Sequence, residues 1–130
     1  MNVLRNAALM ATLMLGVHVP GAMAQDDLAH ALDCWGVTHG SYFLHLASPE
    51  TAGDLPKASD ADYRAWSNQA ETLAKAKGMS LGAFSAERQK YQVSLISAKK
   101  RAAATPRLKT CIATAPLDML NVETPILVGD

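Results

Sequence analysis

Residues 59–78 read SDADYRAWSNQAETLAKAKG, and this stretch decides the fold. Ser59 followed three residues later by Asp62 resembles a capping box, which begins a helix by satisfying its free N–H groups. Gly78 suits the left-handed position that ends a helix, and basic residues precede it. Apolar residues recur between these signals at three- and four-residue steps, as on one helix face: Tyr63, Trp66, Ala70 and Leu73. The stretch therefore predicts a helix from about Asp60 to Lys77.

The flanking sequence continues the helical pattern. Residues 26–46 predict a first helix, in which Gly36 and Gly40 lie four apart on one face. Either the helix bends there or another backbone packs closely against it. Residues 47–58 are expected to form a loop. Residues 80–103 predict a third long helix, which the short Gly78-Met79 link sets antiparallel to the second.

The C-terminal part predicts one more short helix and an apolar tail. Thr105 and Pro106 suit the N-cap and first position of a helix that ends near Ala113. Residues 117–130 are rich in large apolar side chains and are expected to pack on the bundle. The fold class predicted is all-α, a small helical bundle of three long helices plus a short C-terminal helix.

The first 24 residues are typical of a secretory signal peptide. An apolar run over residues 7–19 is followed by the A-x-A site Ala22-Met23-Ala24, and charged residues follow at once. The run is shorter than the roughly 20 residues that span a bilayer, so no stable membrane anchor is expected after cleavage. The sequence predicts a periplasmic or secreted bacterial protein that begins at Gln25, with the bundle domain over residues 25–116.

The chain has two cysteines, Cys34 and Cys111. An even number of cysteines in an exported chain indicates a disulfide, which here would join the first helix to the last. The alternative is a metal shared by His30 and Cys34, which needs a free thiol and lacks the usual paired-cysteine spacing. We therefore expect a disulfide, no metal site and no cofactor.

The charges are unevenly distributed, although 12 Lys and Arg balance 12 Asp and Glu. Residues 25–62 hold seven acids and one base, whereas residues 88–109 hold seven bases and no acid. Either the acidic and basic segments pack together, or a basic face docks on something anionic. The absence of a general excess of base argues against a nucleic-acid partner.

Five bases follow the predicted third helix into the fourth and form the candidate interaction surface. Near a helix C-terminus such bases would stabilise the helix through its dipole. The alternative is contact with anionic lipid head groups, polysaccharide or an acidic partner protein of the envelope. The five residues are Lys99, Lys100, Arg101, Arg107 and Lys109.

Arg88 is the candidate buried polar residue, because it falls in the apolar stripe of the predicted third helix. A buried guanidinium is costly unless it is paired. Three interpretations stay open. Its head reaches solvent while its stem packs, or it pairs with Glu71 or Asp33, or it binds an anionic ligand.

The sequence contains no H-E-x-x-H motif, no Cys-x-x-Cys-His of covalent haem and no carboxylate pair set by spacing. We therefore expect no enzyme but an exported protein that acts by protein–protein contact, inhibitor- or immunity-like, with an unknown envelope partner. Two alternatives are a small-ligand or metal-binding bundle with a cleft beside Arg88, and a hydrolase whose site is assembled from distant residues. The sequence does not predict the oligomeric state.

Overall fold

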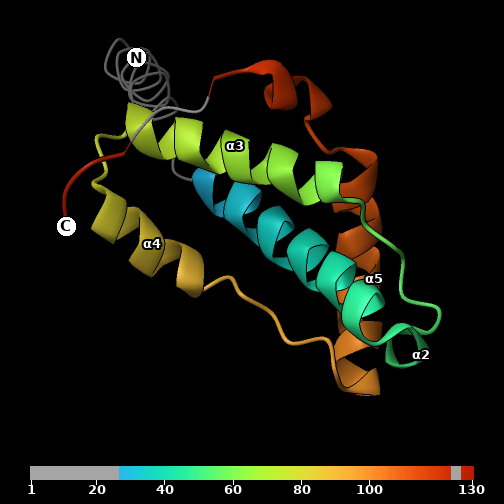
Figure 1. The fold of residues 1–130 in the computed structure, drawn as a ribbon. Coiled ribbons are helices and arrows are strands. Elements are labelled where there is room, and N and C mark those ends of the chain that lie inside the picture. The colour runs from blue at the N-terminus through green and yellow to red at the C-terminus, as the bar shows by residue number, and fades with distance from the viewer. Residues whose placement is uncertain (1–26, 124–126) are drawn as a thin grey trace, which may run out of the picture.

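The computed structural model describes residues 27–123 and 127–130, which form helices joined by turns and extended segments (Figure 1). Helix 27–47 is followed by α2 (Pro49–Ala52), α3 (Asp60–Ala76), α4 (Leu81–Gln89), α5 (Ala98–Ala113) and the 3-10 helix η1 (Leu117–Asn121). No strand occurs in the described ranges, so the predicted all-α class is confirmed. The predicted signal peptide lies outside the described residues.

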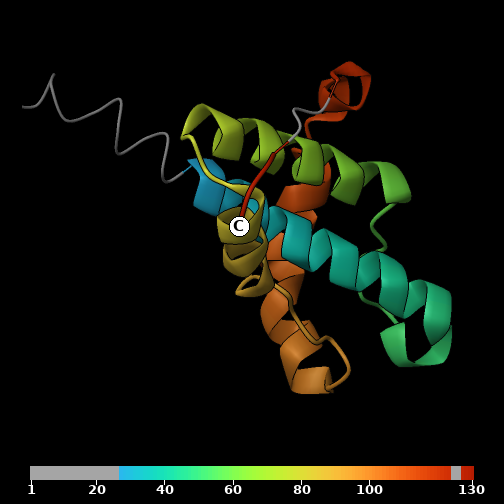
Figure 2. The same cartoon turned by 60° about the vertical axis from the view of Figure 1, so that its left-hand side comes forward.

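Helix 27–47 is the centre of the bundle. Figures 1 and 2 show α3 along one side of it and α4 on the other, with α5 crossing it steeply. The chain reverses direction after α3 at Gly78, whose φ is +74°. A left-handed glycine at this position allows the tight turn that returns α4.

The signals that predict α3 act as expected. The Ser59 hydroxyl accepts a hydrogen bond from the Asp62 N–H at 3.1 Å, and the Asp62 carboxylate accepts one from the Ser59 N–H at 2.8 Å. This reciprocal pair is the capping box, and it satisfies two N–H groups that the helix leaves free. The predicted helix is therefore confirmed within one residue at its C-terminal end.

The core joins α3 and α5 to helix 27–47. The predicted disulfide is present: Cys34 and Cys111 are bonded, are both almost fully buried, and lie 5.2 Å apart between their Cα atoms. Next to it, the Trp66 indole N–H donates to the Cys111 carbonyl at 2.9 Å. Large apolar side chains surround this pair, among them Leu28, Leu32, Trp35, Phe84, Leu95 and Leu108.

The prediction of one helix over residues 80–103 is wrong. α4 ends at Gln89, residues 92–96 are not helical and run as a drawn-out segment (Figure 1), and α5 begins only at Ala98 after the N-cap Ser97. The reason is tertiary. The chain packs against helix 27–47 at the two glycines, with the Tyr91 carbonyl against Gly36 and the Val93 and Leu95 side chains against Gly40. β-branched Val93 also suits an extended conformation. Of the two explanations for Gly36 and Gly40, close approach of another backbone is the one found at Gly36, whereas mainly side chains pack on Gly40.

The predicted start of the last helix at Thr105 is also wrong. Pro106 is the ninth of the 16 residues of α5 and lies inside the helix. The Ser97 hydroxyl caps α5 by accepting from the Lys100 N–H at 3.2 Å. Three alanines at 102–104 are strong helix formers, and they continue the helix through the proline despite its cost.

Residues 47–58 and the C-terminal segment after α5 contain regular structure that the sequence did not predict. Residues 47–58, predicted as a loop, contain the short helix α2 with Pro49 at its first position. η1 lies against α3, where the Asn68 amide donates to the Met119 carbonyl at 3.0 Å. Residues 127–130 run beside the start of α4, where the Val128 carbonyl accepts from the Leu81 N–H at 3.2 Å. None of the described helices is long and apolar enough to cross a membrane.

Candidate functional site

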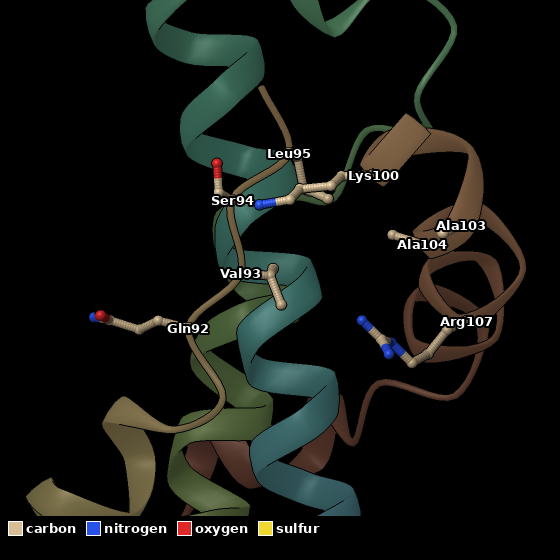
Figure 3. A pocket seen from close by; sticks show the side chains of 8 residues that line it. All are labelled: Gln92, Val93, Ser94, Leu95, Lys100, Ala103, Ala104 and Arg107. Carbon is tan, nitrogen blue, oxygen red and sulfur yellow. The ribbon is translucent and has the colours of Figure 1, made fainter. Parts of the chain in front are cut away.

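A groove of about 350 Å³ lies between the extended segment and α5, and we call it the basic groove (Figure 3). Its walls come from both elements, and both of its charged residues are basic. The lining residues are Gln92, Val93, Ser94, Leu95, Lys100, Ala103, Ala104 and Arg107.

The helical wall of the groove has cations at its two ends and small residues between them. Lys100, Ala103, Ala104 and Arg107 follow the spacing of one helix face. Lys100 and Arg107 are therefore separated by about 10.5 Å along the helix axis. Figure 3 shows both side chains reaching from α5 toward the groove. The alanines keep the middle of this wall low, so an extended chain has room between the charged ends.

The opposite wall is an extended backbone. Val93 and Leu95 are turned toward α5, whereas the Gln92 side chain points away (Figure 3). From Val93 to Ser97, no backbone N–H donates to another backbone group in the described part of the chain. Unpaired strand-like backbone is a template for pairing with a second extended chain.

The structure separates the five predicted interaction residues. Lys99, Lys100 and Arg101 lie in the first turn of α5, so the interpretation that they stabilise a helix C-terminus is wrong. No acidic residue lies in that turn. Cations at a helix N-terminus are opposed by the helix dipole, by about 0.3–1 kcal/mol each when exposed.

Two of the five bases have partners in the fold. The Arg101 guanidinium donates to the carbonyls of Leu95 (3.1 Å) and Ile96, which fixes the end of the extended segment. Arg107 forms an ion pair with Asp33 at 3.4 Å, so the acidic and basic segments of the chain do meet at this point. Lys109 is exposed and lies outside the basic groove.

Arg88 is half-buried, and its guanidinium lies over two aromatic rings. Its Cζ atom is 5.3 Å from the centroid of the Trp35 ring and 5.5 Å from that of Phe84. It makes no ion pair within 4.0 Å with either predicted partner: Asp33 pairs with Arg107, and Glu71 feels only the more distant charge of Arg88. Burial raises the pKa of the Glu71 carboxyl above its usual value, while Arg88 opposes that rise.

The sequence did not predict that aromatic rings cluster around His39. The imidazole centroid lies 5.0 Å from the Trp35 ring, 4.6 Å from the Phe43 ring and 5.2 Å from the Tyr63 ring. Burial lowers the pKa of His39, and the charge of Arg88 lowers it further. The signal available in the sequence was the four-residue spacing of Trp35, His39 and Phe43, which places them on one helix face.

The alternative metal site at His30 and Cys34 has no free thiol. The His30 Nε2 atom lies 3.8 Å from the Cys34 sulfur, but that sulfur is in the disulfide. Over residues 27–123 and 127–130, no three His, Cys, Asp or Glu side chains form a group that could hold a metal ion.

The described part of the chain is thus a disulfide-bonded all-α bundle with a basic groove on its surface. Comparison of the chain with known proteins finds no matching family model, no matching curated protein and no matching solved structure. A disulfide is typical of proteins outside the cytoplasm, which agrees with the predicted export.

Proposed function

We propose that this protein is a non-enzymatic binding protein of the bacterial periplasm, and that its basic groove holds an extended acidic segment of a partner protein. The observation that carries the proposal is the pairing of an extended backbone, whose N–H groups from Val93 to Ser97 have no backbone partner in the described residues, with a helix face that has Lys100 and Arg107 at its ends. An inhibitor- or immunity-like protein, which acts by covering a segment of its target, would use such a groove.

Charge supports an acidic partner. Three bases in the first turn of α5 are opposed by the helix dipole, and no acid in that turn offsets them. A carboxylate bound beside Lys100 would relieve part of this opposition. Electrostatic complementarity of this kind raises the rate of association and selects against basic partners.

Shape supports an extended segment. In a strand, alternate side chains face the same way and are about 7 Å apart. Long acidic side chains at alternate positions could therefore face α5 and reach Lys100 and Arg107, while the backbone between them passes over Ala103 and Ala104. Hydrogen bonds from the backbone N–H groups of Val93 to Ile96 would add affinity without demanding a particular sequence.

The test compares two charge reversals on α5. Lys100→Glu changes the basic groove, whereas Lys109→Glu changes the net charge equally at an exposed position outside it. The probe is a short fluorescent peptide of alternating Glu and Val, and its binding to the purified oxidised protein is followed by anisotropy. We expect the affinity for the peptide to fall as salt is added. We also expect it to be at least about tenfold lower in Lys100→Glu, because a repulsive charge replaces an attractive one.

Two outcomes would contradict the proposal. If both reversals weaken binding equally, the peptide follows net charge and not the basic groove. If the peptide with Gln in place of Glu binds as well as the acidic one, the charge of the partner is irrelevant. The same three proteins, immobilised in envelope extract, then identify the partner as the protein that Lys100→Glu alone fails to retain.

A further inference from the structure

A second hollow lies between α3, α4 and Leu127, and it shares no lining residue with the basic groove. We call it the Glu71–Arg88 cleft. Its volume is about 160 Å³, and its lining residues are Glu71, Leu81, Phe84, Ser85, Arg88 and Leu127. Glu71 and Arg88 thus both line one small space that also has an apolar wall.

The two charges come from different helices and are both partly desolvated. Glu71 on α3 is half-buried, and burial raises the pKa of its carboxyl. Arg88 on α4 is also half-buried, with its guanidinium over the Trp35 and Phe84 rings. Contact with the faces of these rings leaves the N–H edge of the guanidinium available to an anion.

These opposite charges do not pair with each other or with another residue in the described part of the chain. The described ion pairs join Arg64 with Asp60, Lys90 with Glu87, and Arg107 with Asp33, and none includes Glu71 or Arg88. Partly buried charges gain most from a partner that brings the opposite charge and hydrogen bonds. A ligand with an anionic and a cationic group would satisfy both sides of the cleft.

We propose that the Glu71–Arg88 cleft binds a free aliphatic α-amino acid. Its carboxylate pairs with Arg88, its ammonium group pairs with Glu71, and its side chain contacts Leu81, Phe84 and Leu127. A water molecule occupies about 30 Å³, so the space suits a ligand of roughly five to ten non-hydrogen atoms. A neutral His39 adds no third charge near Arg88, and the lowered pKa of His39 favours that neutral form.

Molecules with a single charge fit this cleft less well. A simple carboxylate gains Arg88 but approaches the Glu71 carboxylate, and a simple ammonium ion gains Glu71 but approaches Arg88. Each of these two ions is therefore repelled by one of the two cleft charges, whereas a zwitterion is attracted by both. The apolar wall distinguishes an aliphatic side chain from a charged one, because burying a further charge without a partner is costly.

The proposal is tested by nuclear magnetic resonance on the isotope-labelled oxidised protein. The readouts are the side-chain N–H of Arg88, which lines the cleft, and the indole N–H of Trp35, whose ring lies under the Arg88 guanidinium. Free leucine is compared with isocaproate, which lacks the ammonium group, and with isopentylamine, which lacks the carboxylate. We expect saturable shifts with leucine and binding at least about tenfold weaker for each single-charge analogue, as expected for loss of a charge-assisted hydrogen bond. Equal binding of either analogue, or no shift with leucine, would overturn the proposal.

Variants separate binding from folding. Glu71→Gln and Arg88→Lys should each weaken leucine binding at least about tenfold. Glu87→Gln is the matched control, because this carboxylate on α4 pairs with Lys90 at 2.8 Å and does not line the cleft. Lys100→Glu should leave leucine binding unchanged, so failure of one site is distinguishable from failure of the other. If Glu87→Gln weakens binding as much as Glu71→Gln does, the cleft is not the site.

Discussion

The carbonyl oxygen of Tyr91 lies 2.0 Å from the point where a β-carbon on residue 36 would stand. Helix 27–47 and Tyr91, the residue that leads into the extended segment, can meet at this distance only because residue 36 is glycine. The contact sets where the extended segment lies, and the extended segment forms one wall of the basic groove. A glycine in the core helix therefore determines a feature of the surface.

We expect Gly36→Ala to lower the free energy of unfolding by about 1–3 kcal/mol, because the added methyl group overpacks the contact. Helix propensity alone predicts the opposite sign, a gain of about 1 kcal/mol. Urea unfolding of the oxidised protein measures the difference. At Gly40 the nearest atoms to an added β-carbon are flexible side-chain atoms of Val93 and Leu95, at 3.2 Å and 3.3 Å, so Gly40→Ala should cost less. If Gly36→Ala instead raises the free energy of unfolding, the chain at Tyr91 does not pack against helix 27–47.

Local signals predicted α3 well because its ends are set by its own residues. Ser59, Asp62 and Gly78 satisfy or end the helix without help from the rest of the chain. The disulfide was equally predictable, since Cys34 and Cys111 are the only cysteines. Both features follow from short-range chemistry or from counting.

The break between α4 and α5 was not predictable in the same way. Apolar residues from Leu81 to Leu95 keep a helical spacing, and only contact with Gly36 and Gly40 selects the extended form over part of that range. The pair of glycines was the sequence signal for this contact, but it does not identify the segment that makes it. The sequence identified the basic residues. Which of them line one groove depends on where α5 begins, and that boundary was not predicted.

Pro106 gives a second stability prediction. As an interior residue of α5 it has no N–H to donate to the Ala102 carbonyl, and its ring crowds that turn. Pro106→Ala should raise the free energy of unfolding by about 1–3 kcal/mol, somewhat less than the full cost of an interior proline because the unfolded chain also gains freedom. Urea unfolding checks the sign. Ala102→Gly, an exposed change in the same helix, should lose about 1 kcal/mol, and a loss in Pro106→Ala would contradict this account.

Glu71 gives a pH-dependent prediction. Its folded-state pKa is raised above the unfolded value, so the folded protein binds the proton more tightly than the unfolded chain does. The contribution of Glu71 to stability is therefore present below the unfolded pKa and lost as pH rises through the folded pKa. Glu71→Gln should stabilise the protein at neutral pH, and this advantage should disappear in acid. Melting temperatures of both proteins across the acid range give the difference, and a constant difference would refute the assignment to this carboxyl.

The disulfide gives the largest expected effect. It closes a loop with a sequence separation of 77 residues, and the chain-entropy model assigns such a loop about 4–5 kcal/mol as an upper value. Replacing Cys34 and Cys111 together by Ala should lower the free energy of unfolding by up to that amount, which is a large share of the stability of a small domain. Because both sulfurs are almost fully buried, the wild-type protein should resist mild reductant until urea opens it. Urea titrations of the oxidised, reduced and double-Ala proteins measure the contribution. Reduction of the native protein without denaturant, at the rate of an exposed disulfide, would show that the core around Trp66 opens readily.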